Sequence, residues 1–349
     1  MGDVFQADTS GVLSDSNIHW DSLRGATILV TGATGLIGGV LVTVLSAANE
    51  KFDLNLHIVG HGRNKNKGDN LAQSLGIEFV CGDIRTPSIL ADTIDGVDYI
   101  FHCAAITKSA DMVASPVDVI TTSVDGTRNM LELARVKGCK SFVFLSSMEV
   151  YGQTESCEVR ENDMGYLDLT NPRSSYPESK RFCEMLCISY AAQYKVPVRL
   201  ARLARTFGAG TPNSDNDMRV ANQFARKALA GENIELHTYG NSIANCCYTF
   251  DAVRGLLIIL LEAKIGEVYN VVNPNASATI REMAEIVANE VCDGKIRVIV
   301  NEPGDLVKRG YTSDVRYTLN ADKLKALGWS PQFGLADMYR RMLTDWKKR

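Results

Sequence analysis

A glycine-rich turn between a strand and a helix constrains this chain more than any other feature. Residues 27–30 (Thr-Ile-Leu-Val) form a short β-branched run that indicates a buried parallel strand, and residues 36–48 follow as a helix. Gly32 permits a tight turn, Gly35 lets the backbone approach a pyrophosphate, and Gly38 allows the helix to pack closely on the strand. Because the N-terminus of such a helix offers N–H donors and a favourable dipole to phosphates, this segment predicts a dinucleotide-binding site.

Strand-like and helix-like segments alternate through the first 205 residues. Short apolar runs predict strands at residues 27–30, 56–59, 77–80, 99–102, 141–145 and 198–203. Longer segments predict helices at residues 36–48, 117–136 and 176–194. This alternation is typical of an α/β protein with a doubly wound parallel Rossmann sheet.

Changes in this pattern divide the sequence into three parts. Residues 1–23 are a polar N-terminal extension, and residues 24–205 are the predicted Rossmann domain that binds the dinucleotide. The segment 206–218 is rich in turn-forming residues, which marks the transition to a smaller C-terminal α/β lobe over residues 206–349. We expect this lobe to be interleaved with the Rossmann domain and to contain helices at residues 280–291 and 335–346.

Charge and composition exclude several classes of protein. The chain has 349 residues and a net charge of −4 at pH 7, so no strong positive field favours nucleic acid or an anionic membrane. The longest apolar run, residues 253–261, contains Arg254 and is too short for a membrane span. The N-terminus lacks the basic and apolar regions of a signal peptide, so we expect a cytoplasmic location. The nine cysteines include no CxxC pair, and we therefore expect no metal.

A Tyr-x-x-x-Lys pair supplies the second strong signal. Tyr176 and Lys180 lie one turn apart on one face of the predicted helix. A free tyrosine has a pKa near ~10 and is a poor base at neutral pH, but a nearby ammonium favours the phenolate. Tyr176 can then remove a proton from a hydroxyl while hydride leaves the same carbon. Ser147, which lies 29 residues upstream of the tyrosine, can hydrogen-bond the same oxygen.

These motifs together resemble the extended branch of the short-chain dehydrogenase/reductase family, which contains nucleotide-sugar epimerases, 4,6-dehydratases and UDP-glucuronate decarboxylases. The GxxGxxG spacing of the glycines resembles this family rather than ordinary dehydrogenases, which have GxGxxG. The resemblance covers roughly residues 26–335. Further matching segments are His102-Cys103-Ala104-Ala105, Gly126-Thr127-x-Asn129, Arg202-Leu203-x-x-Thr206-Phe207-Gly208 and Tyr248-x-x-Asp251.

The resemblance implies an enzyme that holds NAD or NADP tightly and acts on a nucleotide sugar. Members of this branch oxidise carbon 4 of the sugar and later return the hydride, so that the reaction is redox-neutral overall. The long helices at 117–136 and 176–194 match those that form a dimer interface in this family, and we expect a homodimer. The positions that match the family's cofactor contacts are Gly32, Thr34, Gly35, Leu36, Ile37, Gly38, Arg63, Asp83, Ile84, Ala104, Ala105, Tyr176 and Lys180.

The residue two positions after Ser147 bears on the chemistry after the oxidation. Dehydratases and decarboxylases of the family carry a glutamate there, and Glu149 occupies this position. Glu149 can remove the carbon 5 proton and drive loss of water from carbon 6. Many dTDP-glucose dehydratases place an aspartic acid between the two residues as a proton donor, but Met148 stands in its place and cannot donate. The resemblance therefore favours a one-glutamate dehydratase or a decarboxylase over the dTDP-glucose type.

We expect a nucleotide-sugar 4,6-dehydratase in which Ser147, Glu149, Tyr176 and Lys180 are catalytic. A UDP-glucuronate decarboxylase or a 4-epimerase is the alternative within the family. Two further hypotheses are a reductase that releases its cofactor and a cofactor-sensing protein without turnover. The intact serine, tyrosine and lysine argue against the last of these.

The end of the second predicted strand leaves the choice of cofactor open. An acid at this place normally binds the ribose hydroxyls of NAD, but residues 59–64 (Val-Gly-His-Gly-Arg-Asn) contain none. Arg63 lies near the expected place and can pair with the 2′-phosphate of NADP or stack on adenine. It can equally be a solvated loop residue.

The predicted diphosphate site departs from the family pattern. The family usually has an arginine four residues before the Tyr248 position, where this chain has Ala244, and an asparagine where it has Arg205. An arginine can form bidentate pairs with phosphates, so Arg205, Arg219 and Arg309 are candidates to bind the diphosphate. Other candidate substrate contacts are Thr107, Lys108 and Met148.

Overall fold

The structure is a computed structural model that describes residues 2–86, 90, 92, 94–214, 217–301 and 314–348. Its centre is a seven-stranded sheet in which every pair of neighbouring strands is parallel, in the order β11-β7-β5-β4-β1-β2-β3. The strands are β1 (Thr27–Thr31), β2 (His57–Gly62), β3 (Glu78–Cys81), β4 (Tyr99–His102), β5 (Ser141–Ser147), β7 (Val198–Leu203) and β11 (Val268–Val271). The predicted Rossmann sheet is therefore confirmed.

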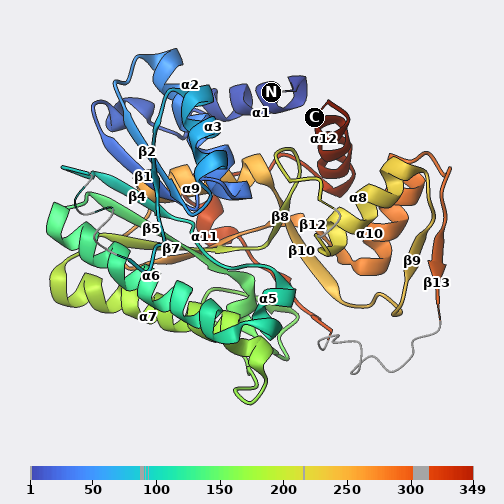
Figure 1. The fold of residues 1–349 in the computed structure, drawn as a ribbon. Coiled ribbons are helices and arrows are strands. Elements are labelled where there is room, and N and C mark those ends of the chain that lie inside the picture. The colour runs from blue at the N-terminus through green and yellow to red at the C-terminus, as the bar shows by residue number, and fades with distance from the viewer. Residues whose placement is uncertain are drawn as a thin grey trace.

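Helices cover both faces of this sheet (Figure 1). One face carries α2 (Leu36–Phe52), α3 (Lys65–Leu75) and α9 (Thr249–Glu262), and the other carries α6 (Pro116–Lys137) and α7 (Ser175–Tyr194). Because both faces are covered, the strands are apolar throughout: Ile28 and Val30 of β1 pack on one side and Leu29 on the other. This is why the strands appear in the sequence as continuous apolar runs.

A smaller group of elements lies beside the sheet (Figure 1). It contains a three-stranded sheet of β8 (Arg205–Phe207), β10 (Ile243–Tyr248) and β12 (Asn273–Thr279), and a pair formed by β9 (Ile234–Leu236) and β13 (Val298–Val300). Its helices are α8 (Val220–Ala230), α10 (Ile280–Ile286) and α12 (Leu335–Lys348). The predicted helix over 280–291 is α-helical to Ile286 and continues as a π-helical turn over Val287–Val291.

The remaining elements are short and connect these parts. They are the helical turns η1 (Trp20–Leu23), η2 (Met148–Tyr151) and η3 (Pro172–Ser174), the helices α5 (Ser109–Ala114) and α11 (Asp322–Lys325), and a pair of two-residue strands, β6 (Glu158–Val159) and β14 (Thr318–Leu319).

Two elements, β11 and α1 (Asp3–Leu13), were not among the strands and helices predicted from the sequence. The sheet takes its seventh strand, β11, from within residues 206–349, because β11 pairs in parallel with β7. The N-terminal extension contains α1, which contacts α2, α9 and α12. In α1, Phe5 and Val12 are buried, and the ring of Phe5 meets that of Phe250 edge to face at 4.9 Å. Burial of these side chains stabilises the helix against the rest of the protein.

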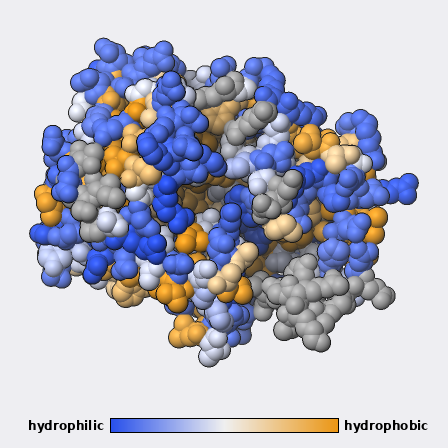
Figure 2. All heavy atoms as spheres, viewed as in Figure 1, coloured by the Kyte–Doolittle hydropathy of each residue, from blue (hydrophilic) through white to orange (hydrophobic). Residues whose placement is uncertain are grey.

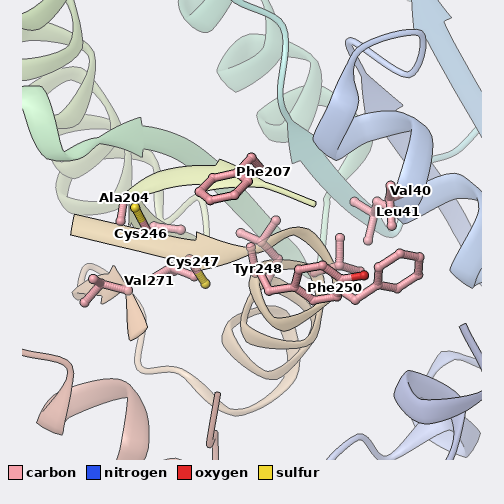
Figure 3. Close-up of a cluster of buried hydrophobic side chains, with 14 of the residues drawn as sticks. Val40, Leu41, Ala204, Phe207, Cys246, Cys247, Tyr248, Phe250 and Val271 are labelled. Carbon is pink, nitrogen blue, oxygen red and sulfur yellow. The ribbon is translucent and has the colours of Figure 1, made fainter. Parts of the chain in front are cut away.

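A buried cluster connects the two groups of elements (Figure 3). Phe207 of β8, Tyr248 of β10 and Phe250 of α9 lie in it together with Val40 and Leu41 of α2. Because α2 also begins at the glycine-rich turn, this packing links that turn to the smaller group.

Among the described helices, none is both long enough and apolar enough to cross a membrane.

Candidate functional site

The glycine-rich turn lies against the segment that follows β4. Gly32 has φ +69°, and a Cβ on it would lie 3.0 Å from the backbone N of Ala104. A Cβ on Gly38 would lie 2.3 Å from the carbonyl oxygen of Gly32. The turn is closed by a hydrogen bond from the Gly35 N–H to the same oxygen at 2.9 Å. Only glycine fits at positions 32 and 38, because any side chain would push the helix and strand apart.

The first turn of α2 presents its N–H groups without a side-chain cap. Gly35 is the N-cap and is exposed, and Thr34, Leu36 and Ile37 around it are half-buried. The unsatisfied N–H groups of a helix N-terminus bind phosphate oxygens well. This turn therefore fits the pyrophosphate of a dinucleotide.

The carboxyl end of β2 forms the neighbouring wall. A Cβ on Gly62 would lie 3.2 Å from Oγ1 of Thr34, so the glycine leaves room next to the turn. His61 is 2% exposed, and burial lowers its pKa to about 4. Its Nδ1 has no hydrogen-bond partner among the described residues. Because buried polar atoms are normally paired, the unpaired nitrogen favours a bound molecule that supplies its partner here.

Arg63 and Asp83 are close to one another beyond this wall. Nε and Nη2 of Arg85 donate to the Asp83 carboxylate at 3.0 and 2.7 Å. This ion pair lowers the pKa of Asp83 to about 2, and the charge of the exposed Arg63 adds to the effect. Ile84 is buried against Gly126 of α6. The expected adenine contact, Asp83, is thus already an ion-pair partner.

A network of hydrogen bonds around His102 supports the glycine-rich turn. Nδ1 of His102 lies 2.8 Å from Oγ1 of Thr31, and its Nε2 lies 3.2 Å from Oγ1 of Thr127. The Ala104 N–H donates to Oγ1 of Thr31 at 3.2 Å. Burial, helped by the charge of Lys180, lowers the pKa of His102 to about 3, so the imidazole is neutral. The network fixes Ala104 and the adjoining half-buried Ala105 beside the turn.

Strand β5 and helix α7 bring Ser147 and Tyr176 together. Ser147 is the last residue of β5 and Tyr176 is the second residue of α7, and the Ser147 hydroxyl lies close enough to the phenol to lower its pKa. Tyr176 is 6% exposed. Burial raises the pKa of its phenol, and the charge of Glu149 raises it further. The neighbouring Ser147 hydroxyl and the charge of Arg173 both lower this pKa.

Lys180 lies on the same face of α7, one turn after the tyrosine. It is 3% exposed, and its Nζ donates to the carbonyl oxygen of Leu145 at 2.6 Å. The Nζ lies 5.9 Å from the centre of the Tyr176 ring and 4.6 Å from that of Phe144. Burial lowers the pKa of its ammonium. The lysine is therefore anchored beneath the tyrosine rather than exposed to solvent.

Glu149 lies in the turn η2 immediately after Ser147. Its side chain is 37% exposed, and its Oε2 accepts a hydrogen bond from Nη2 of Arg173 at 2.9 Å. The charges of Glu149 and Arg205 both act on Tyr317, which is 3% exposed. Burial raises the pKa of Tyr317 to about 12, and the neighbouring Tyr151 and Glu149 contribute. Carboxylate, phenol and guanidinium groups therefore meet beside Ser147.

The predicted substrate contacts are more scattered. Met148 is 5% exposed and packs in the hydrophobic core, whereas Thr107 and Lys108 are exposed at the start of α5. Arg205 is exposed on β8. Arg219 caps α8, and its Nε donates to both oxygens of Asp217 at 2.9 and 3.0 Å. Arg309 lies outside the described residues.

Sequence reasoning missed two residues of this site. Arg173 lies three residues before Tyr176, but its partner Glu149 is 24 residues away, so no local spacing signals the pair. Tyr317 reaches the site from a segment next to β14, and its sequence surroundings carry no recognisable motif. Both residues are recognised only from the fold.

The arrangement can perform proton transfer beside a bound dinucleotide. The carboxyl ends of β1, β4 and β5 meet at one edge of the sheet, where ligands of doubly wound folds bind. This edge carries the open helix N-terminus of α2 together with the side chains of Ser147, Tyr176 and Glu149. A phenol and a carboxylate provide two separate proton acceptors, as a sequence of two deprotonations requires.

Comparison with known proteins places these features in a family. A family model described as the NAD dependent epimerase/dehydratase family matches residues 28–272. The chain is 32% identical over 341 residues to UDP-glucuronic acid decarboxylase 6 of Arabidopsis thaliana, covering 97% of this chain and 92% of that protein.

Two solved structures share the fold. DesIV, a dTDP-glucose 4,6-dehydratase from Streptomyces venezuelae with NAD and TYD bound, is 26% identical with a TM-score of 0.74, covering 92% of this chain and 97% of that one. The UDP-glucose 4-epimerase of Thermotoga maritima with UDP-glucose is 22% identical with a TM-score of 0.78, covering 92% of this chain and 99% of that one.

Proposed function

The chain belongs to the NAD dependent epimerase/dehydratase family, and from this premise we propose that it is a nucleotide-sugar 4,6-dehydratase that retains its cofactor. The observation that carries the proposal is Glu149, a half-exposed carboxylate in the turn that follows Ser147. In this proposal residues 24–205 mainly hold the cofactor and residues 206–349 mainly hold the nucleotide sugar.

The first step is oxidation at carbon 4 of the sugar. Tyr176, as the phenolate, takes the proton of the 4-hydroxyl, and Ser147 hydrogen-bonds the same oxygen. Lys180, anchored on Leu145, adds positive charge beneath the phenol. When bound, the nicotinamide supplies the acceptor for the hydride that leaves carbon 4 and returns this hydride in the last step.

The second step uses Glu149. The 4-keto group acidifies the proton on carbon 5, and the carboxylate removes it. The same proton, now on Glu149, can protonate the carbon 6 hydroxyl, which then leaves as water. The returning hydride would go to carbon 6, and the proton that Tyr176 took from the 4-hydroxyl balances the proton that carbon 5 must regain. Glu149 performs both proton transfers in this proposal, because Met148 is buried in the core and cannot act as a separate acid.

A decarboxylase is the second candidate, and a specific observation favours it. The curated relative that is 32% identical over 97% of this chain is named as a UDP-glucuronic acid decarboxylase. In that reaction the 4-keto group stabilises the negative charge that forms on carbon 5 when the carboxylate attached to carbon 5 leaves as carbon dioxide. Arg173 provides a positive charge near this place.

Product mass separates the candidates. The purified protein is incubated with UDP-, dTDP-, GDP- and CDP-hexoses and with UDP-glucuronate, and the products are analysed by mass spectrometry. Loss of one water from a hexose supports the dehydratase. Loss of carbon dioxide means that it is a decarboxylase, and an unchanged mass with a shifted retention time means an epimerase. Net consumption of added NAD(P)H would reject a retained cofactor.

Two observations support binding of the cofactor at the glycine-rich turn: the start of α2 has no side-chain cap, and Gly62 leaves room beside the turn. Arg63 and the absence of an acid over residues 59–64 favour NADP, whereas DesIV, as a similar structure, holds NAD. Denaturing the purified protein and identifying the released nucleotide by mass decides between the two.

We propose a homodimer built on α6 and α7. Figure 2 shows hydrophobic residues among hydrophilic ones on the surface of the molecule. On these two helices the exposed hydrophobic residues are Val117, Ile120, Val136, Phe182, Met185, Ile188 and Tyr194. Such a set on two packed helices is suited to a second copy of the same surface. Light scattering tests this, and a monodisperse monomer would exclude it.

A further inference from the structure

We propose that Arg173 is a positioning residue that allows Glu149 and Tyr176 to act as two bases in one site. The inference rests on the proposed function in one respect, that Tyr176 starts the reaction by accepting a proton. The part of it that concerns the charge balance at Tyr176 applies also to a decarboxylase or an epimerase, because all three begin with oxidation at carbon 4.

The guanidinium of Arg173 is paired with Glu149, and its charge also reaches the phenol of Tyr176. It lies in the turn η3, three residues before Tyr176, and its Nη2 is 2.9 Å from Oε2 of Glu149. The side chain of Arg173 is 21% exposed and that of Glu149 is 37% exposed. The pair is therefore partly shielded from water, where an ion pair is stronger than on an open surface.

The turn that carries Arg173 is built independently of Glu149. Oδ1 of Asn171 accepts the Arg173 N–H at 3.0 Å, and the carbonyl oxygen of Asp168 accepts the Ser174 hydroxyl at 2.6 Å. Oδ1 of Asp168 also accepts the Thr170 N–H at 2.9 Å. These bonds fix the backbone from which the arginine side chain extends. Its placement does not depend on the ion pair alone.

Two bases in one site create an electrostatic conflict. The phenolate that starts the reaction is negative, and the carboxylate of Glu149 is negative as well, so each opposes the ionisation of the other. The charge of Glu149 raises the pKa of Tyr176 and the charge of Arg173 lowers it. The arginine therefore offsets the carboxylate at the phenol and also restricts the rotamers of Glu149 through the ion pair.

The surroundings of Tyr176 leave few other charges to provide this balance. Helices α5 and α6 face it with the apolar side chains of Met112 and Val119. Its polar and charged neighbours, taken from β5, η2, η3 and α7 in turn, are Ser147, Glu149, Arg173 and Lys180. Lys180 is held by the carbonyl of Leu145 and is not paired with the competing carboxylate. Arg173 is the cation paired directly with the competing carboxylate.

The test is the pH dependence of the first half-reaction. Reduction of the bound cofactor in a single turnover is followed by its absorbance, with the nucleotide sugar that gives the largest signal. The rate rises with pH as Tyr176 ionises. We expect Arg173→Gln to move the midpoint up by about one pH unit and Glu149→Gln to move it down. In the double variant the two shifts cancel, and the midpoint returns close to that of the wild type.

Two further variants separate this role from a structural one. Arg173→Lys keeps the charge, so the midpoint of its pH dependence is expected to lie close to that of the wild type. Its rate should remain below that of the wild type, because lysine lacks the planar fork of arginine. Arg160→Gln removes an arginine that pairs with Glu158 on the surface, and its midpoint should equal that of the wild type. A midpoint that Arg173→Gln leaves unchanged would overturn the proposal.

A second measurement does not require turnover. The holoenzyme is labelled with 13Cζ-tyrosine, the signal of Tyr176 is assigned with Tyr176→Phe, and its ionisation is followed by NMR. The same order of midpoints is expected: Glu149→Gln lowest, wild type and double variant between, and Arg173→Gln highest. If no sugar nucleotide reduces the cofactor, the proposed function fails, and this titration still decides the role of Arg173: coincident titrations of wild type and Arg173→Gln would refute it.

Discussion

The backbone N–H of Glu149 donates a hydrogen bond to Oγ of Ser147 at 3.2 Å. The same serine hydroxyl lies beside the phenol of Tyr176, so one side chain lies next to both the residue that follows β5 and the second residue of α7. The turn η2 therefore holds the Glu149 backbone against the serine that is proposed to act in the oxidation. In the proposed reaction, oxidation at carbon 4 and deprotonation at carbon 5 can be separated by changing Glu149 alone.

Glu149→Gln is expected to separate them. The amide cannot accept the carbon 5 proton, so formation of the dehydrated product should fall by about 100-fold or more. Oxidation depends on Tyr176, so cofactor reduction should persist and the reduced form should accumulate. Rapid-scan absorbance and product mass measure the two quantities in one sample.

The matched control is Glu158→Gln, a surface glutamate paired with Arg160, which should leave both quantities unchanged. Full formation of the dehydrated product by Glu149→Gln would remove Glu149 from the mechanism and require another base for the carbon 5 proton.

Arg63 is expected to discriminate between the two cofactors. If it pairs with a 2′-phosphate, Arg63→Ala should weaken NADP+ binding by about tenfold or more, the loss of a charge-assisted pair, and change NAD+ binding little. Calorimetric titration of the cofactor-free protein gives both dissociation constants. Lys65→Ala is the control, because Lys65 is the first residue of the adjoining helix α3 and is paired with Asp69. Equal losses for both cofactors would instead place Arg63 on the adenine.

The local parts of this fold could be predicted from the sequence. Six of the seven sheet strands and the long helices α2, α6 and α7 were predicted within a few residues, because buried strands and capped helices leave patterns in neighbouring positions. The strand β11 was missed because four residues with no adjoining signal become a strand only by pairing with β7. Helix α1 was missed because its stability comes from burying Phe5 and Val12 against distant helices.

The same limit applies to the candidate site. Residues that lie in motifs, such as Gly32, Ser147 and Tyr176, could be singled out by their spacing. Arg173 and Tyr317 could not, because their partners are determined by tertiary packing across 24 residues and more. The burial of Met148 was also not accessible from the sequence, since the turn η2 decides which way its side chain points.

The arginines proposed for the diphosphate should differ in their effects. Arg205 is exposed near Tyr317 and is free of any ion pair among the described residues, whereas Arg219 is held by Asp217 on two oxygens. Arg205→Ala should therefore raise KM for the nucleotide sugar by about tenfold or more, and Arg219→Ala should raise it less. Steady-state kinetics with both variants measures this. The reverse order would mean that Asp217 releases Arg219 when the substrate binds.

His102 should make stability depend on pH. In the folded protein the pKa of this buried imidazole is lowered to about 3, against about 6.5 in an unfolded chain. Between these values the unfolded chain binds more protons, so the free energy of unfolding must rise as pH rises from 3 to 6.5 and then level off. At pH 5 the histidine costs about 2 kcal/mol relative to pH 8.

Replacing His102 removes this contribution. His102→Gln can retain hydrogen bonds to Thr31 and Thr127 but does not titrate, so its free energy of unfolding should fall by about 2 kcal/mol less than that of the wild type between pH 8 and pH 5. Urea unfolding at the two pH values measures the difference. His61, whose pKa is about 4, contributes in the same direction and leaves part of the pH dependence in place. His237→Gln alters an exposed histidine and should follow the wild type. Parallel pH curves for His102→Gln and the wild type would contradict this prediction, because they would mean that burial does not lower the pKa of the imidazole.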